Sequence, residues 1–136
     1  MCTTKISKSE TSVLQSNILQ SHSVGVGKPI EKDIAKLMLI LKHSRCQRYS
    51  GIALNTLERI IWHIENNAIP VVPSQGSVGA SGDLAPLSHL FLPLIGLGKV
   101  SYNNEIITSE ILFKKTVKTY CPSPKEGLAL INGTHL

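Results

Sequence analysis

The chain has 136 residues, a formal net charge of +5 and an isoelectric point near 9.2, with 42% hydrophobic and 17% charged residues. It contains no apolar run near the roughly 18 to 20 residues that span a bilayer, so we expect a cytoplasmic protein without a membrane partner. The basic residues are scattered and only 4% of residues are aromatic, so we expect no nucleic-acid partner either.

The cysteines and histidines predict neither disulfides nor a metal site. The chain has three cysteines, an odd number, and they lack the paired spacing of zinc ligands because Cys2, Cys46 and Cys121 lie far apart. The five histidines form no His-x-x-x-His pair. We therefore expect reduced thiols and no bound metal.

Apolar periodicity predicts that the first half of the chain is helical. A first helix begins near a capping box at Ser7 and Glu10 and ends between residues 23 and 27. A second helix follows Pro29, and a third ends at Asn66 and Asn67. The apolar positions that define these helices are Val13, Leu14, Ile18 and Leu19; Ile30, Ile34, Leu37, Met38 and Leu41; and Ile52, Leu57, Ile60, Ile61 and Ile64.

The second half is predicted to enter and leave a glycine-rich loop. Residues 69–73 contain two prolines, and each disfavours the α conformation in the residue before it, so this stretch is extended. After the loop, apolar residues from Leu84 to Ile95 predict a helix whose free amides are capped by Asp83. The chain then continues with a predicted hairpin over residues 100–107, a short helix over 109–119 and a loop at 122–124.

The glycine-rich loop covers residues 76–83, with the sequence GSVGASGD. Gly82 has no Cβ, so its amide nitrogen is unhindered and can approach the carbonyl carbon of Ala80 to close a five-membered ring. Loss of the Ser81 hydroxyl as water would then leave an exocyclic methylene, which is an electrophile. The alternative is an ordinary turn in which Ser81 or Asp83 caps the next helix.

Two other kinds of glycine-rich loop are excluded by their spacing. A nucleotide-hydrolase phosphate loop ends in Gly-Lys-Ser/Thr, and no lysine lies between Lys42 and Lys99. A nucleophile elbow needs Gly-x-Ser-x-Gly, and the run from Gly79 to Gly82 is one residue short of it. On the residues alone, the ordinary turn and the self-cyclising loop both stay open.

Three stretches carry a family resemblance that extends over nearly the whole chain: residues 76–87 (GSVGASGDLAPL), 15–27 (QSNILQSHSVGVG) and 124–134 (PKEGLALINGT). They resemble the aromatic amino acid ammonia-lyases, the histidine and phenylalanine ammonia-lyase family. The resemblance implies a mainly α, histidase-like fold with a small β-hairpin and a glycine-rich prosthetic-group loop. It also implies that Ala80, Ser81 and Gly82 cyclise autocatalytically into methylidene-imidazolone (MIO), with loss of two waters, and that Asp83 helps.

The resemblance also places four residues at the substrate, namely Ser21, His22, Leu84 and Asn132. Family members that act on histidine tend to carry Ser-His at the first two positions, so His22 favours an imidazole substrate. A site that hydrogen-bonds a polar ring rejects an apolar ring, because its own polar groups would be left unpaired. The implied activity is elimination of ammonia from L-histidine, or a related aromatic amino acid; from histidine it gives urocanate, a step of histidine degradation. Without the resemblance, His22 is interpreted as a surface or helix-capping residue and Asn132 as part of a turn.

Two alternatives accompany this interpretation: a phenylalanine or tyrosine ammonia-lyase, and a non-catalytic remnant or interaction module. Family enzymes are homotetramers several times longer, so we expect residues 1–136 to be a single partial domain that is inactive alone. Tyr49, Tyr102 and Tyr120 do not match the family's catalytic tyrosine. Two segments, 42–48 and 135–136, depart from the family pattern, as shifts of reading frame or divergence would produce.

Overall fold

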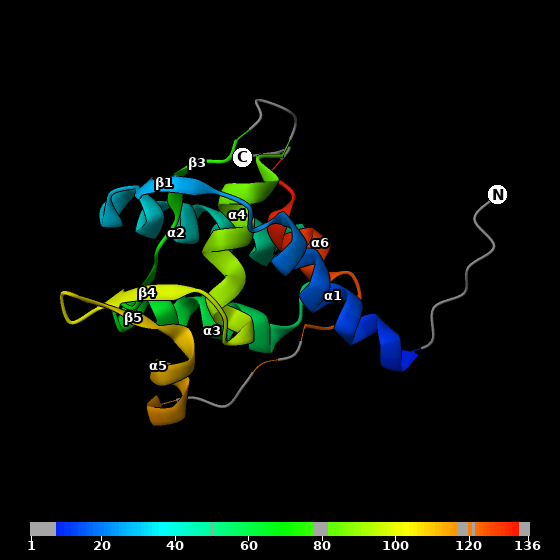
Figure 1. Ribbon diagram of the computed structural model, residues 1–136. Helices are drawn as coiled ribbons and strands as arrows, with labels where there is room; N and C mark the ends of the chain where they lie inside the picture. The colour runs from blue at the N-terminus through cyan, green and yellow to red at the C-terminus, as the bar shows by residue number, and fades with distance from the viewer. Residues whose placement is uncertain (1–7, 50, 78–81, 117–119, 121, 134–136) are drawn as a thin grey trace.

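The computed structural model describes residues 8–49, 51–77, 82–116, 120 and 122–133. Along the chain the elements are α1, β1, α2, α3, β2, β3, α4, a 3-10 helix, β4, β5, α5 and α6. Figure 1 shows α4 running through the middle of the molecule, with α1 and α6 to its right and β4 and β5 to its left. The predicted class, mainly α with a small hairpin, is confirmed.

Three helices make up most of the first half, as the periodicity predicts. They are α1 (Lys8–His22), α2 (Lys32–Tyr49) and α3 (Leu54–Glu65). Ser7, the first residue of the predicted capping box, lies outside the described residues. The end of α3 agrees with the prediction, because Asn66 donates its amide to Trp62 O at 3.0 Å and Asn67 adopts a φ of 51°.

The strands form two small antiparallel sheets. In one, β1 (Val26–Pro29) pairs with β3 (Pro73–Gln75), which places Val26 opposite Gln75. In the other, β2 (Ile69–Pro70), β4 (Lys99–Tyr102) and β5 (Glu105–Thr108) lie in that order. The predicted hairpin is confirmed, since Asn103 and Asn104 between β4 and β5 both have the positive φ of a type I′ turn. The strand β1 was not predicted, because its residues are all exposed and show no apolar alternation.

The helix that follows the glycine-rich loop begins at Leu84 as predicted, but its cap and its C-terminal end differ from the prediction. It covers Leu84–Phe91 (α4) and then tightens into a 3-10 helix, Leu92–Ile95. Pro93 has no N–H for the α-helical ladder, which explains the change. Asp83 does not cap α4: its side chain makes no capping hydrogen bond, and its left-handed backbone (φ 41°, ψ 53°) differs from the extended conformation of a capping residue.

The last two helices are short. The helix α5 (Ser109–Thr116) lies within the predicted range, and residues 117–119 lie outside the described part of the chain. The helix α6 (Glu126–Ile131) was not predicted. It has too few residues to show a helical period, and Gly127 lowers its intrinsic helix propensity.

The main hydrophobic core surrounds α4. Buried side chains from five helices, α1, α2, α3, α4 and α6, meet there. The helix that begins at the loop packs most closely against α1 and α6. They include Leu19, Leu39, Ile60, Leu87, Leu90, Phe91, Leu130 and Ile131. A smaller cluster of Ala68, Val100 and Leu112 joins the hairpin to α5. Among the described residues, no helix combines the length and apolar character needed to cross a membrane.

Candidate active site

The downstream end of the glycine-rich loop lies at the start of α4. Gly82 has a φ of 106°, a conformation that residues with a Cβ rarely adopt. Ala80 and Ser81, the other two predicted precursors of the prosthetic group, lie outside the described residues. The structure therefore places the loop through Gly82, Asp83 and the residues before position 78.

A hydrogen bond joins the two sides of the loop. The hydroxyl of Ser77 donates to a carboxylate oxygen of Asp83. This bond occupies the side chain that the sequence suggested as a helix cap. It therefore joins Ser77, the last described residue before position 78, to Asp83 at the start of α4.

The end of α6 reaches the loop from another direction. The Gly133 amide donates to the Gly82 carbonyl at 3.1 Å, and a Cβ built at position 133 would stand 2.7 Å from that oxygen. Only glycine allows this approach without a shift of the backbone. Asn132, predicted at the substrate, is the C-terminal cap of α6 and lies one residue from the contact.

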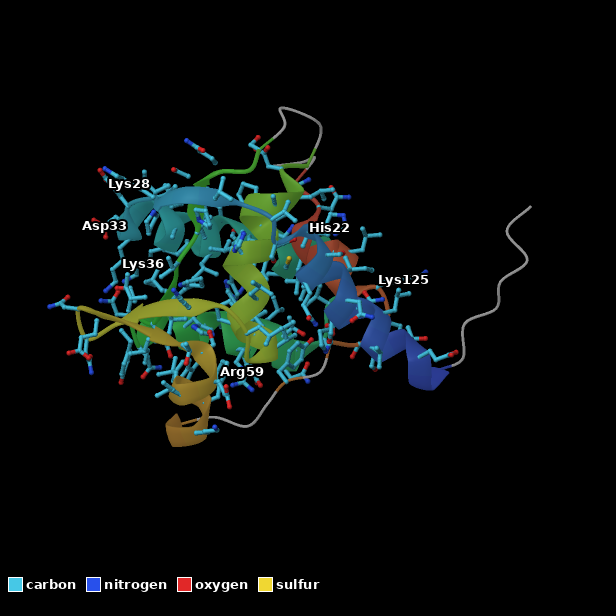
Figure 2. The ribbon with its side chains drawn as sticks, viewed as in Figure 1. His22, Lys28, Asp33, Lys36, Arg59 and Lys125 are labelled. Carbon is cyan, nitrogen blue, oxygen red and sulfur yellow. The ribbon has the colours of Figure 1, made fainter. Side chains whose placement is uncertain are left out.

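Ser21 and His22 end α1, and Figure 2 shows His22 near α6. The Nδ1 of His22 lies 2.8 Å from Ile18 O, and the Ser21 hydroxyl donates to the same carbonyl at 3.1 Å. A carbonyl oxygen only accepts, so Nδ1 carries a hydrogen, and Nε2 of the neutral ring is then an acceptor. The side chain thus has the helix-capping geometry considered from the sequence.

A contact between α1 and α6 fixes these two ends relative to each other. Gly127, in the first turn of α6, donates its amide to the buried Gln15 Oε1 at 2.9 Å. A Cβ at position 127 would stand 2.8 Å from Gln15 O, so the helices meet with backbone against backbone. The residues at the ends of α1 and α6, His22 and Asn132, are therefore held on one framework.

The segment after His22 also packs against the loop. Gly25 donates its amide to His89 Nε2 on α4 at 3.0 Å, and a Cβ at Gly76 would stand 2.9 Å from the Gly25 Cα. Burial lowers the pKa of His89, which suits its role as a neutral acceptor. His89 therefore connects the segment after His22 to α4.

Lys42 is a neighbour of this site that the sequence did not indicate. Its side chain is buried in α2, and its Nζ donates to the Asn132 carbonyl at 2.7 Å. Burial lowers the pKa of this amine. In the sequence this lysine directly follows the apolar run 37–41, but it also opens the segment 42–48, which departs from the family pattern.

One groove lies apart from this site, and the described residues hold no metal cluster. Among the described residues, no group of three His, Cys, Asp or Glu side chains gathers closely enough to hold a metal ion. A groove of about 170 Å³ lies beside β2 and β4, but none of the candidate site residues lines it. The candidate site consists of the residues that meet around Gly82.

The fold and this loop define the class of the protein. A family model described as aromatic amino acid lyase matches residues 1–136. The chain belongs to this family.

Known relatives narrow the likeness further. The histidine ammonia-lyase of Streptococcus sanguinis (strain SK36) is 42% identical over 136 residues, which are 98% of this chain and 26% of the relative. The solved histidine ammonia-lyase of Trypanosoma cruzi superposes with a TM-score of 0.88 at 35% identity, over 98% of this chain and 26% of the other. The tyrosine aminomutase of Streptomyces globisporus gives 0.83 at 32% identity, over 96% and 24%. The chain thus spans about a quarter of the length of these proteins.

Proposed function

We propose that this chain is the part of a histidine ammonia-lyase that carries the prosthetic-group loop and one wall of the substrate site. The observation that carries the proposal is the hydrogen bond from Gly133 to Gly82, which puts Asn132 beside the loop. The relatives named histidine ammonia-lyases support it. Because the chain spans about a quarter of their length, the activity belongs to the whole protein.

The described residues fit an MIO group made from residues 80–82. Gly82 has the positive φ of a position without a Cβ, and its carbonyl is held by the Gly133 amide. Ring closure forms the bond from Gly82 N to the Ala80 carbonyl carbon. The Ala80 oxygen leaves as water with the amide hydrogens of Ser81 and Gly82. The Ser81 hydroxyl leaves as a second water with its Cα hydrogen, so no oxidant is needed.

Such a group would supply an electrophile that captures the substrate covalently and divides a difficult elimination into easier steps. The chain's own residues would prepare the site around it. The N-terminus of α4 carries a partial positive charge that favours negative charge at the loop. In its neutral form His22 presents Nε2 as an acceptor for an imidazole N–H, and Asn132 supplies an amide near Gly82.

The choice of histidine over phenylalanine or tyrosine depends on Ser21 and His22. A phenyl ring offers no hydrogen-bond partner to Nε2, so binding it would leave a polar group unpaired.

We include in the proposal the homotetramer and the cytoplasmic location expected from the sequence. A complete active site needs more than this chain, because the family's catalytic tyrosine is expected to lie outside residues 1–136.

Mass spectrometry of one tryptic peptide tests ring formation. Trypsin cuts after Arg59 and Lys99, and no lysine or arginine lies between them, so peptide 60–99 contains the whole loop. We expect this peptide to be lighter by two waters. A peptide of unmodified mass, both in the chain alone and inside a complete enzyme, would exclude the proposed chemistry.

Substrate choice is tested in a complete enzyme. In the Streptococcus sanguinis histidine ammonia-lyase, this chain replaces the matching segment, which gives the chimaeric enzyme used below. We expect it to release ammonia from histidine faster than from phenylalanine or tyrosine, and the 136-residue chain alone to release none. Faster turnover of phenylalanine or tyrosine would favour the alternative lyases. A cyclised but inactive chimaeric enzyme would favour a non-catalytic remnant.

A further inference from the structure

Lys42 is a buried amine with one hydrogen-bond acceptor among the described residues. Its side chain is 4% exposed, and its Nζ donates to the Asn132 carbonyl at 2.7 Å. Taking an ammonium group out of water is costly unless hydrogen bonds compensate it. The contact therefore holds the Asn132 carbonyl firmly.

The same peptide group contacts the loop through its other end. The carbonyl of Asn132 accepts from Lys42, and the N–H of the same peptide, on Gly133, donates to Gly82 O at 3.1 Å. One rigid peptide plane thus connects α2 to the loop. A donor on the carbonyl polarises the peptide, and hydrogen bonds in such a chain strengthen each other by roughly 10–30%.

The connection reaches the residue that takes part in ring closure. Gly82 is the third precursor of the proposed MIO group, and its amide nitrogen forms the new bond. The Gly82 carbonyl, held by Gly133, is attached to the same Cα. Because a Cβ at position 133 would stand 2.7 Å from that oxygen, the peptide plane leaves Gly82 little room to move on this side.

We propose that Lys42 is a positioning residue for formation of the prosthetic group. Through the Asn132–Gly133 peptide it holds Gly82 in the orientation from which its nitrogen attacks the Ala80 carbonyl carbon. This inference rests on the proposed function, because it assumes that the loop cyclises. Atoms balance as given above: one C–N bond forms and two waters leave.

The contrasting possibility is that Lys42 only anchors α6 to α2. Lys42→Met removes the desolvation cost of the buried ammonium together with its hydrogen bond to the Asn132 carbonyl, and these two effects on stability have opposite signs. We therefore expect the thermal unfolding midpoint of the chain to change little. A slower cyclisation in such a stable variant separates positioning from mere support of the fold.

The test follows peptide 60–99 over time. The chain and the chimaeric enzyme are made by cell-free synthesis, sampled at intervals and digested with trypsin, and the fraction of the peptide lacking two waters is measured. Position 42 lies outside this peptide, so the mass reports on the loop alone. We expect Lys42→Met to slow the loss of water about tenfold or more, since a charged hydrogen bond is lost. Lys42→Arg, which restores a charged donor, should recover most of the rate.

Leu39→Met is the matched control for Lys42→Met. It introduces the same side chain about one turn earlier on α2, at a buried core position that takes no part in the hydrogen bonds of the Asn132–Gly133 peptide given above. It should cyclise at the unsubstituted rate. If it slows as much as Lys42→Met, the effect belongs to the packing of α2 and the inference fails.

A second variant approaches the same connection from Gly133. Gly133→Ala places a methyl group against Gly82 O and should also slow cyclisation about tenfold or more. Gly51→Ala is its control, because a Cβ at Gly51 meets nothing within 4 Å. If the unsubstituted protein does not cyclise, the proposed function fails. If it cyclises and Lys42→Met cyclises at the same rate, the role of Lys42 is refuted, whatever the rate of Gly133→Ala.

Discussion

His63 is buried in α3 between two aromatic rings. Its ring meets those of Trp62 and Phe113 edge to face, with centroids 5.3 and 6.1 Å away. Its Nδ1 lies 2.7 Å from Ala68 O, and its Nε2 has no hydrogen-bond partner among the described residues. Burial lowers the pKa of His63 from 6.5 to about 4.

This shift makes stability depend on pH. Between pH 6.5 and about 4 the unfolded chain binds a proton at this site that the folded chain does not, so stability falls as the pH falls. We expect His63 to account for a loss of about 2.5 kcal/mol of unfolding free energy between pH 7 and 4.5. Urea unfolding at the two pH values should show a smaller loss for His63→Leu. His43 is a half-buried histidine of α2, and His43→Leu should keep the full loss of unfolding free energy. Equal losses in the His63→Leu and unsubstituted chains would show that His63 does not cause the pH dependence.

His22 determines the choice of substrate ring in the proposed function. If its Nε2 accepts a hydrogen bond from imidazole, His22→Leu removes that bond while it retains an apolar side chain. We expect kcat/KM of the chimaeric enzyme for histidine to fall roughly 10- to 100-fold, with a smaller change for phenylalanine. His43→Leu should change neither value. An equal fall for both substrates would mean that His22 only caps α1.

At the scale of elements, a buried carboxylate joins α3 to α6. Glu126 is 2% exposed and accepts hydrogen bonds from the amides of Ala53 and Ser123 and from the hydroxyls of Thr56 and Tyr120. Burial alone would raise the pKa of Glu126, but these hydrogen bonds outweigh it and hold the pKa below its ordinary value. Because Ala53 precedes α3, the carboxylate also lies at the positive end of that helix.

Substitution of Glu126 measures how much the hydrogen bonds of this carboxylate contribute to the free energy of unfolding. Glu126→Gln replaces one acceptor oxygen by an NH₂ group that faces donors, so we expect unfolding free energy at pH 7 to fall by about 3 kcal/mol. Glu58→Gln, an exposed change on α3, should stay within about 0.5 kcal/mol. Both are measured by urea unfolding. A similar small change for the two variants would show that α6 does not depend on the carboxylate.

Long helices and the hairpin could be predicted from the sequence because their signals are local. The strand β1 and the helix α6 could not, since each depends on distant partners: β1 on β3, and Gly127 of α6 on Gln15 of α1. Asp83 has the right residue type for a cap, but Ser77 engages it instead. Local preferences therefore located the elements but not the contacts that stabilise the short ones.

Part of the candidate site could likewise be predicted from the sequence, and part of it could not. The motif identified the loop and Asn132, because these residues are recognisable by order and spacing. Lys42 and Asn132 are 90 residues apart, and Gly25 and His89 are 64 apart. Such pairs leave no periodic trace in a single sequence. Only the folded chain shows that a lysine from α2 contacts the peptide beside the loop.

At the scale of the whole molecule, one side of α2 remains apolar and exposed. It comprises Ile34, Leu37, Ile40 and Leu41, each between 43 and 53% exposed, on one face of the helix. Exposed apolar patches of this kind mark surfaces that other protein covers, or that aggregate when left bare. In the proposed function, the remaining three quarters of the enzyme would cover this face.

Leu37→Lys tests this expectation in two settings. In the 136-residue chain it should reduce self-association in sedimentation velocity without lowering the unfolding midpoint, because Leu37 contributes little to the core. In the chimaeric enzyme the same lysine would be forced against apolar protein, and recovery of folded enzyme should drop. Ile111→Lys is the control, since Ile111 of α5 is similarly exposed at 48% but lies outside this face. If both lysines have the same effect in both settings, the face of α2 is ordinary surface rather than an interface with the rest of the enzyme.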